Sequence, residues 1–282
     1  MAEISATLVV KLREMTSAGM MDCKKALVET NGDLAAAVDL LRKRGVATAA
    51  KKAQREAREG AIAQCILPGA RVGVLLEVNC ESDFVAKNEM FRAFCDQAVR
   101  ALAENPAADL ETLRTDAVAR IRENIKIARH QRFEVSGNGL VAAYIHTGAK
   151  VGVLVEVGAG NEATTTRDDF RQLVKDITLQ IAAASPAAVS REQVDPAIVA
   201  KEKEIVAASD LLKNKPPAAL AKIIEGKLEK FFQTACLLDQ GFVKRNSEIT
   251  VREHLATVAK QLDDEITIRR FVRFQVGEAF AS

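Results

Sequence analysis

Residues 60–78 read GAIAQCILPGARVGVLLEV, and residues 139–157 read GLVAAYIHTGAKVGVLVEV. At a constant offset of 79 residues, eleven of these nineteen positions are identical. Apolar residues lie on both sides of a Gly-Ala pair in each copy, which predicts a β-hairpin that turns at Gly69-Ala70 or Gly148-Ala149. A helical pattern follows each hairpin. The repeat therefore predicts an α+β fold whose core consists of two related halves, each a hairpin followed by a helix.

The chain before the first hairpin has a helical pattern. Leu8, Leu12 and Met15 form the apolar stripe of a first helix, and two further helices follow, the last of which is predicted to end at Gly45. Residues 46–59 are rich in alanine and in charges of both signs, which predicts an exposed helical linker. A three-helix bundle of this size is too small for a catalytic cleft and favours an interaction module.

An insertion interrupts the second half. Residues 196–212 and 218–232 predict two amphipathic helices that pack as an antiparallel hairpin. Such a hairpin suits a contact with a subunit or a partner, although packing back on its own core stays open. Residues 268–280 predict a last strand and a short terminal helix.

These patterns divide the chain into predicted domains. They are the N-terminal bundle (1–55), the first half of the core (56–138), the second half (139–185 and 233–262), the inserted hairpin (186–232) and a C-terminal module (263–282).

Glu81 to Phe91, read ESDFVAKNEMF, is the candidate functional stretch. It lies between a predicted strand and a predicted helix, where Phe84 could either cap the core or bind a partner. The repeat provides an internal control, because positions that both copies share are explained by the common fold. At the offset of 79, residues 83–87 (DFVAK) match residues 162–166 (EATTT). The fold therefore does not require Phe84, and a protruding phenylalanine makes an effective anchor.

Composition excludes several classes of partner. The 282-residue chain is 48% apolar and 28% charged, as expected of a globular protein with a sizeable core. Its net charge is only +2 and its charges are interspersed, so we expect no direct contact with nucleic acid. No apolar stretch approaches the ~20 residues that span a bilayer. The N-terminal pattern resembles neither a signal peptide nor a transit peptide, so we expect a cytoplasmic protein.

The sequence predicts no catalytic, metal or cofactor site. Five cysteines without a CxxC pair and three scattered histidines argue against a disulfide framework and a metal centre. Gly158-Ala159-Gly160 follows a strand but lacks the third glycine of a dinucleotide-binding loop. Cys80 could serve a hydrolase or a redox enzyme only with a nearby base, which no histidine supplies. We therefore expect a protein that is not an enzyme.

The chain resembles the bacterial elongation factor Ts family along nearly its whole length. The matching segments are MTSAGMMDCKKAL (15–27), EVNCESDFVAKN (77–88), YIHTGAKVGVLVEV (144–157), EGKLEKFF (225–232) and RFVRFQVGE (270–278). The resemblance implies an N-terminal bundle like a ubiquitin-associated (UBA) domain, a core of two related halves, a projecting helical hairpin for dimerisation and a C-terminal module. It also implies guanine nucleotide exchange on elongation factor Tu, without chemistry of its own.

The resemblance also implies site residues. Asp83 and Phe84 match an acidic-aromatic pair that inserts between helices of the partner's GTPase domain. The other positions expected to contact the partner are Val85 and Lys87 beside that pair, Arg13, Met20, Met21 and Lys24 in the bundle, Ile121, and His146, which matches a histidine that touches another domain of the partner.

The sequence departs from the family pattern at two of these places. Ser82 stands where the family often has threonine, which should matter little. Arg122 stands where the pattern has glycine, which weakens the expectation for the neighbouring Ile121. A homodimer and a two-plus-two complex with the partner both stay open, and an adaptor that uses the bundle without exchange activity is the alternative function.

Overall fold

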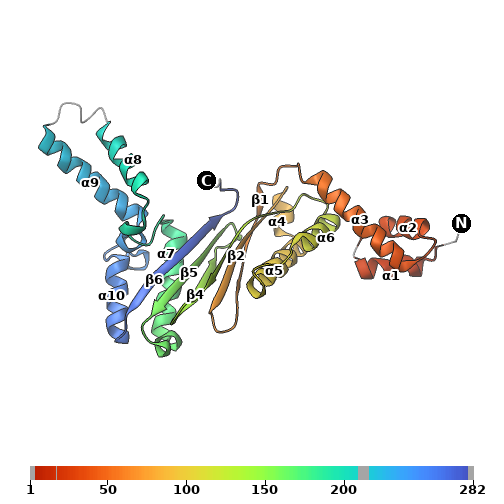
Figure 1. Ribbon diagram of the computed structural model, residues 1–282, viewed down its shortest axis with the longest axis horizontal. Helices are drawn as coiled ribbons and strands as arrows, with labels where there is room; N and C mark the ends of the chain where they lie inside the picture. Colours follow the sequence, from red (N-terminus) through yellow and green to blue (C-terminus); the bar gives the residue numbers. More distant parts are fainter. Residues whose placement is uncertain (1–3, 17, 209–215, 279–282) are drawn as a thin grey trace.

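The computed structural model describes residues 4–16, 18–208 and 216–278 of the chain. The molecule is elongated (Figure 1), with three N-terminal helices at one end, a helical hairpin at the other and two β-sheets between them. The N-terminal helices are α1 (Ala6–Thr16), α2 (Met20–Glu29) and α3 (Leu34–Lys52). Within the described ranges, no helix has the length and the apolar run needed to cross a bilayer.

Each copy of the repeat forms a three-stranded antiparallel sheet. The first contains β1 (Glu59–Ile66), β2 (Val72–Cys80) and β3 (Lys126–Glu134), in that order, and the second contains β4 (Gly139–Ile145), β5 (Val151–Ala159) and β6 (Ile266–Gln275). Both hairpins turn at the predicted Gly-Ala pairs. The α+β class with two related halves is therefore confirmed.

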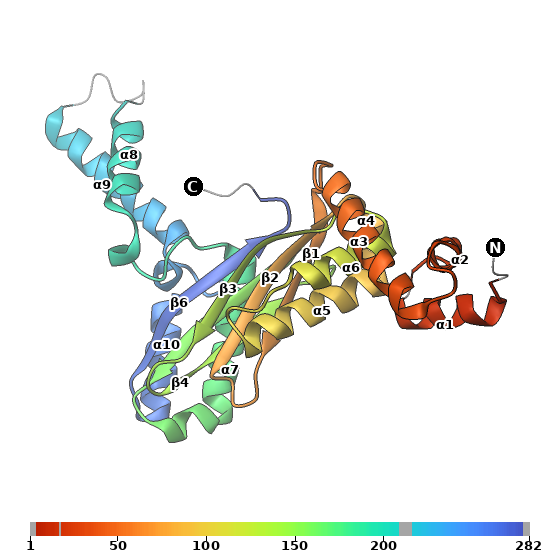
Figure 2. The same ribbon diagram turned by 45° about the vertical axis from the view of Figure 1, so that its right-hand side comes forward.

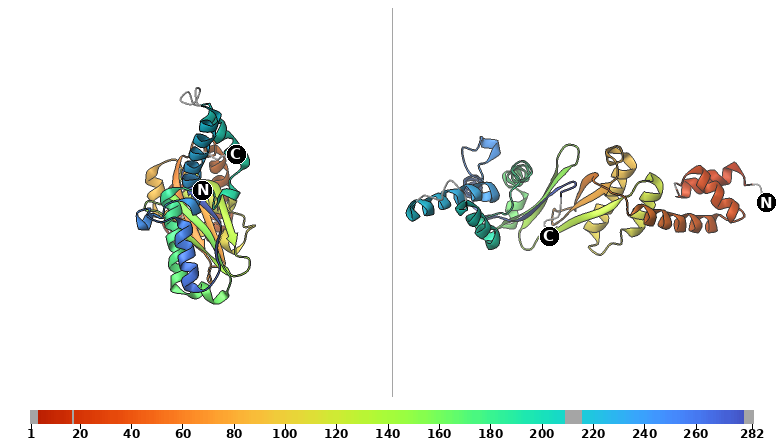
Figure 3. Two further views of the ribbon diagram at one scale, coloured as in Figure 1. Left: turned by 90° about the vertical axis from the view of Figure 1, so that its left-hand side faces the viewer. Right: turned by 90° about the horizontal axis from the view of Figure 1, so that it is seen from above.

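The two sheets pack face to face and helices cover their outer faces (Figures 2 and 3). The first sheet carries α5 (Glu89–Glu104), against which α6 (Glu111–Ile121) packs, and the second carries α7 (Asp168–Ala184) and α10 (Val251–Leu262). Because both faces of each sheet are covered, β2 and β5 are buried at every position after the first. The core between the sheets is made of Ile62, Leu75, Phe133, Val135, Val141, Leu154 and Phe274.

A second repeat, which the hairpin comparison missed, supplies the third strand of each sheet. Residues 126–135 (KIARHQRFEV) and 267–276 (TIRRFVRFQV) share five of ten residues at an offset of 141. The matching arginines make matching ion pairs, Arg129 with Glu77 and Arg270 with Glu156, both at 2.7 Å. The duplicated unit therefore includes the closing strand.

The halves also exchange contacts across the sheet interface. The guanidinium of Arg129 lies 4.3 Å from the ring centre of Phe274, and that of Arg270 lies 4.4 Å from the ring centre of Phe133. Each of these cation–π contacts joins the third strand of one half to the third strand of the other. Neither half completes its interface alone.

The Gly158-Ala159-Gly160 segment has a structural explanation. Both sheets contain a bulge at the glutamate that the two copies share, Glu77 in the first and Glu156 in the second. The extra residue in the second sheet is Arg269. Its guanidinium binds Glu156 at 3.0 Å and would lie 2.4–2.7 Å from a Cβ atom at position 158. Glycine at this position therefore makes room for Arg269. The glycine is explained by this packing and not by a dinucleotide-binding loop.

The prediction that the third helix ends at Gly45 was wrong. Helix α3 continues to Lys52, and a Cβ atom at Gly45 would lie 3.6 Å from the Cβ atom of Ala119 in α6. The small residue permits close helix packing. Residues 46–52 are helical and mostly exposed, as predicted for the linker, although Ala49 is buried. Met15, which was predicted to face the bundle core, is instead 58% exposed.

The insertion forms a helical hairpin that contacts the core through its base. It consists of α8 (Pro196–Ala207) and α9 (Pro217–Ala235). Arg191 clamps that base by binding Glu229 at 2.6 Å and Asp239 at 2.9 Å. The predicted helix end at 209–212, the connection at 213–215 and the end of the predicted terminal helix at 279–280 lie outside the described residues.

We predict that Glu156 is a major source of stability. Its side chain is 3% exposed and binds both Arg269 and Arg270. The Glu156→Ala substitution should lower the free energy of unfolding by about 1–3 kcal/mol, because two partly exposed guanidinium groups lose their carboxylate but keep main-chain carbonyl acceptors. Urea denaturation measures this change.

Glu56→Ala is the matched control, because Glu56 pairs with Arg58 at the surface with 69% and 80% of the side chains exposed. It should change the free energy of unfolding by about 0.5 kcal/mol or less. If the two substitutions lowered the free energy of unfolding equally, the buried pairs of Glu156 would contribute no more stability than the exposed pair of Glu56.

Candidate partner-binding site

Phe84 projects from a short helix, α4 (Asp83–Lys87), that lies between β2 and α5. Its side chain is 81% exposed, the largest exposure among the large apolar residues of the described chain. Ala86 is buried and Val85 packs against the core of the first half. The helix therefore turns one side inward and presents Phe84 outward, and Phe84 does not cap the core.

The turn that carries Phe84 is held by hydrogen bonds to the loop after α6. The Glu123 carboxylate accepts from the main-chain N–H groups of Glu81 and Ser82, both at 3.0 Å, and from the Ser82 hydroxyl at 2.6 Å. The Ser82 Oγ atom in turn accepts from the N–H of Val85 at 3.3 Å and caps α4. Phe84 is therefore mounted on a fixed support.

The second half keeps this support without the phenylalanine. At the offset of 141, Asp264 matches Glu123, and its carboxylate accepts from the N–H of Asn161 at 3.0 Å. Asn161 matches Ser82 at the offset of 79, and a 3₁₀ turn, η1 (Glu162–Thr166), follows it. Ala163 is exposed at the position of Phe84. The acid-supported turn belongs to the common fold, whereas the exposed ring belongs to the first half.

Alternating charges connect α4 with the turn of the second hairpin. Asp83 and Lys87 form an ion pair at 2.8 Å, which lowers the pKa of Asp83 and raises the pKa of Lys87. Glu59 raises the pKa of Lys87 further through its charge, and Glu59 itself pairs with Lys150. The row of charges therefore extends from α4 to the β4–β5 turn.

His146 lies in that same turn. Its side chain is exposed and hydrogen-bonded through Nδ1 to the Tyr144 hydroxyl at 3.0 Å. The contact between the sheets places this turn beside the first half. His146 therefore lies near Lys150, where the row of charges from α4 ends.

The N-terminal candidates form a separate surface. Arg13, Met20, Met21 and Lys24 are all exposed on α1 and α2, with Met20 and Met21 at 50% and 62%. Helix α3 lies between them and α4 (Figure 1), so the structure does not gather all candidates into one patch. Ile121, the last residue of α6, is half-buried against the first core cluster.

The departure at Arg122 has a conformational consequence. Arg122 ends α6 in the left-handed region with φ 65°, where glycine is favoured, and its counterpart Asp263 ends α10 with φ 50°. Its guanidinium binds Asp22 of α2 at 2.6 Å. Sequence reasoning missed Asp22 and Glu123, although the offset of 141 would have paired Glu123 with Asp264.

Cys80 lies directly below the turn but is not an activated nucleophile. Its side chain is fully buried, and its Sγ atom lies 3.2 Å from the Ser82 carbonyl oxygen. Burial raises the pKa of Cys80 to about 12, so the group is a neutral thiol at physiological pH. Cys80 therefore supplies no activated thiolate to this turn.

Comparison with known proteins identifies one family. The family model described as elongation factor TS matches residues 81–278. The elongation factor Ts of Symbiobacterium thermophilum is 44% identical over 285 residues, which cover 99% of this chain and 93% of the relative. That of Nitratidesulfovibrio vulgaris is 41% identical over 281 residues, with 99% and 98% covered. That of Bdellovibrio bacteriovorus is 42% identical over 288 residues, with 97% and 92% covered.

We predict that Glu123 fixes the turn that carries Phe84. Glu123→Gln replaces one accepting oxygen by an NH₂ group, so at least one N–H or O–H of residues 81–82 loses its partner. The free energy of local opening should fall by about 1–3 kcal/mol. Faster hydrogen exchange at the amides of Val85 and Ala86 reports this change.

Glu89→Gln provides the control, because Glu89 is exposed at the start of α5. It should leave the exchange of α4 unchanged. Wild-type exchange rates in Glu123→Gln would mean that the main chain alone holds the turn.

Proposed function

The chain belongs to the elongation factor Ts family, and we propose that it is the guanine nucleotide exchange factor for the GTPase elongation factor Tu. Family membership makes it a translation elongation factor. The observation that best supports the proposed exchange activity is the 81% exposed ring of Phe84 on a turn held by Glu123. We propose that it acts in the cytoplasm, without a cofactor or chemistry of its own.

The exposed ring would act as a wedge between two helices of the partner's GTPase domain. A GTPase holds GDP through main-chain amides of its phosphate-binding loop and through Mg²⁺, which demands near-ideal octahedral geometry. A small displacement of the partner's helices is enough to spoil that geometry and loosen the phosphates. Burial of the phenylalanine ring supplies ~1.5–3 kcal/mol toward that displacement.

Asp83 would fix the wedge and compete for groups near the metal. The hydrogen bond from Lys87 lowers its pKa, so the carboxylate is charged when the partner arrives. Both members of the pair are solvent-exposed, so Asp83 exchanges Lys87 for a group of the partner at little cost. Lys87 is then released to contact the partner itself, beside Val85.

Separate surfaces would contact separate parts of the partner. We propose that Arg13, Met20, Met21 and Lys24 bind the same GTPase domain as Phe84, where flexible methionine side chains adapt to the partner's surface. His146 would contact another domain of the partner, and Ile121 would support the first contact. Helices α8 and α9 would contact a second copy of the chain.

Thermodynamic linkage makes such a complex reversible. The factor by which this protein weakens GDP binding must equal the factor by which GDP weakens the binding of this protein. The complex is therefore tight without nucleotide and dissociates when nucleotide binds. An exchange factor requires this behaviour in every cycle.

We predict that Phe84→Ala slows the release of fluorescent GDP from elongation factor Tu. Loss of the buried ring should reduce the second-order rate constant roughly 10- to 100-fold, since each ~1.4 kcal/mol corresponds to a factor of ten. Stopped-flow fluorescence measures this rate directly.

The second half provides a matched control. Ala163→Phe places an exposed ring on the equivalent turn, and the double variant Phe84→Ala/Ala163→Phe should be as slow as Phe84→Ala alone. A wild-type protein that does not accelerate release would refute the exchange function. Undiminished acceleration by Phe84→Ala would refute the wedge while leaving the exchange function intact.

A further inference from the structure

Arg122 occupies a backbone conformation that arginine rarely adopts. Its φ is 65°, in the left-handed region where the Cβ atom of an L-residue crowds the backbone. Its counterpart in the second half is Asp263, a residue type that tolerates this region better. Arginine is less favourable than glycine at this point, but its side chain makes a contact that glycine could not make.

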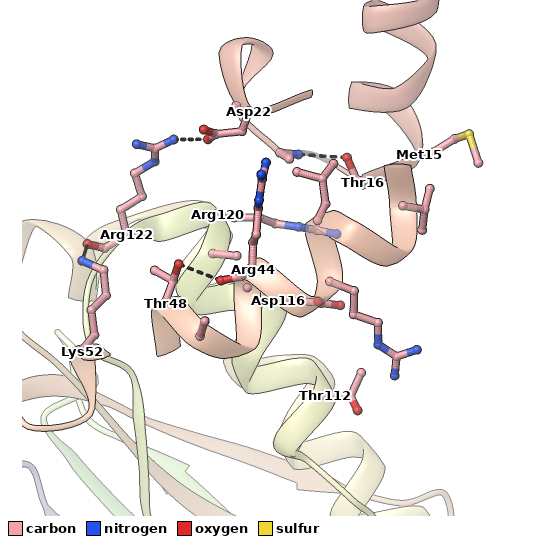
Figure 4. Close-up of a pocket in the computed structure, with 18 of the residues that line it drawn as sticks. Met15, Thr16, Asp22, Arg44, Thr48, Lys52, Thr112, Asp116, Arg120 and Arg122 are labelled. Carbon is pink, nitrogen blue, oxygen red and sulfur yellow. Dashed lines mark hydrogen bonds and ion pairs between the residues drawn. The ribbon is translucent and has the colours of Figure 1, made fainter. Parts of the chain in front are cut away.

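The side chain of Arg122 reaches from the core to the N-terminal helices (Figure 4). Its Nη2 atom lies 2.6 Å from the Oδ2 atom of Asp22, in the first turn of α2. Lys52, at the end of α3, donates a hydrogen bond to the main-chain carbonyl of Arg122. The residue therefore joins the end of α6 to both α2 and α3.

Helix α3 joins the N-terminal helices to the core, because Gly45 packs beside Ala119 of α6 and Ala49 belongs to the first core cluster, whereas α1 and α2 pack on α3. They form their own apolar cluster around Leu12, Cys23 and Leu27. Between the N-terminal helices and α6 lies a cleft of about 770 Å³, lined by apolar residues such as Leu41 and by polar residues that include Asp22, Arg44 and Arg120 (Figure 4). The Asp22–Arg122 pair spans this cleft. On this side of the molecule the cleft separates α1 and α2 from α6, and Asp22 and Arg122 tie them across it.

The next residue along the chain supports the other binding surface. Glu123 holds the turn of Phe84 through three hydrogen bonds, while Asp22 lies one residue after Met21 on α2. Arg122 and Glu123 are consecutive in one loop. Arg122 contacts the helix that carries Met20 and Met21, and Glu123 contacts the turn that carries Phe84; the proposed function assigns both surfaces to the GTPase domain.

We propose that the Asp22–Arg122 ion pair is a latch that orients α1 and α2 relative to α4. Arg122 is a positioning residue, because it acts through Asp22 and not on the partner. The latch presents the methionine surface and Phe84 in the arrangement that the GTPase domain accepts, so less ordering is required upon binding. This inference rests on the proposed function only where it concerns exchange kinetics.

Arg122→Gly separates positioning from stability. Glycine relieves the left-handed backbone, so the urea midpoint should stay unchanged or rise. Loss of an exposed ion pair should raise the KM for the complex of elongation factor Tu with GDP roughly two- to five-fold, with kcat unchanged. If Arg122 had a purely structural role, Arg122→Gly would lower the urea midpoint and raise the KM together.

Two further variants test the charge itself. Arg122→Lys keeps the cation and should retain most of the wild-type KM, whereas Arg122→Gln should behave like Arg122→Gly in KM. The double variant Asp22→Arg/Arg122→Asp reverses the pair and should restore the KM, since Asp263 demonstrates that aspartate fits this conformation.

Distance measurements test the latch without the partner. Lys11 and Asp96 are exposed on α1 and α5, and spin labels at Lys11→Cys and Asp96→Cys in a Cys65→Ser background report the orientation of the N-terminal helices. Electron–electron resonance should give a narrow distance distribution that broadens in Arg122→Gly, in Asp22→Asn and at 1 M KCl, where exposed charges are screened.

An equally narrow distribution in Arg122→Gly and wild type would overturn the latch, as would an unchanged KM. If wild type fails to accelerate GDP release, the proposed function falls, while the distance measurement still decides the latch.

Discussion

The close approach of the two sheets is the constraint on which the remaining structure depends. A Cβ atom at Gly73 would lie 2.6 Å from Val141, and one at Gly152 would lie 2.5 Å from Ile62. Each half therefore opens a space for an apolar side chain of the other, and main-chain hydrogen bonds of 2.8 Å join Ile62 to Ala149 and Val141 to Ala70. This contact sets the second hairpin turn, with His146, beside the first half.

Duplication explains how the fold could acquire an exposed aromatic residue without losing stability. Both halves retain the buried glutamate, its arginine on the third strand and an acid that supports the turn after the second strand. The side chains on that turn can differ between the halves, because the turn is held by hydrogen bonds from its main-chain N–H groups to a carboxylate. Phe84 in one half and Ala163 in the other illustrate this freedom.

The features that could be predicted from the sequence were those fixed by neighbouring residues, whereas those fixed by contacts between distant segments could not. Identity within a gapless repeat predicted both hairpins, and the difference between the copies selected Phe84. The last strand was predicted, but its relationship to β3 was missed, because an insertion shifts the offset to 141 and only five of ten residues match. Helix α3 packs on Ala119 of α6 where it continues past Gly45, and Glu123 supports the turn of Phe84. Such contacts between distant segments have no local signal.

The crossed contacts between Arg129 and Phe274, and between Arg270 and Phe133, bear on how the chain is synthesised. A ribosome delivers residues from the N-terminus onward, so β3 emerges long before β6. Until Arg270 and Phe274 appear, only the β4–β5 hairpin can cover the inner face of the first sheet, and Phe133 lacks its contact with Arg270. Vectorial synthesis therefore makes β6 the step that ends a period of vulnerability to aggregation.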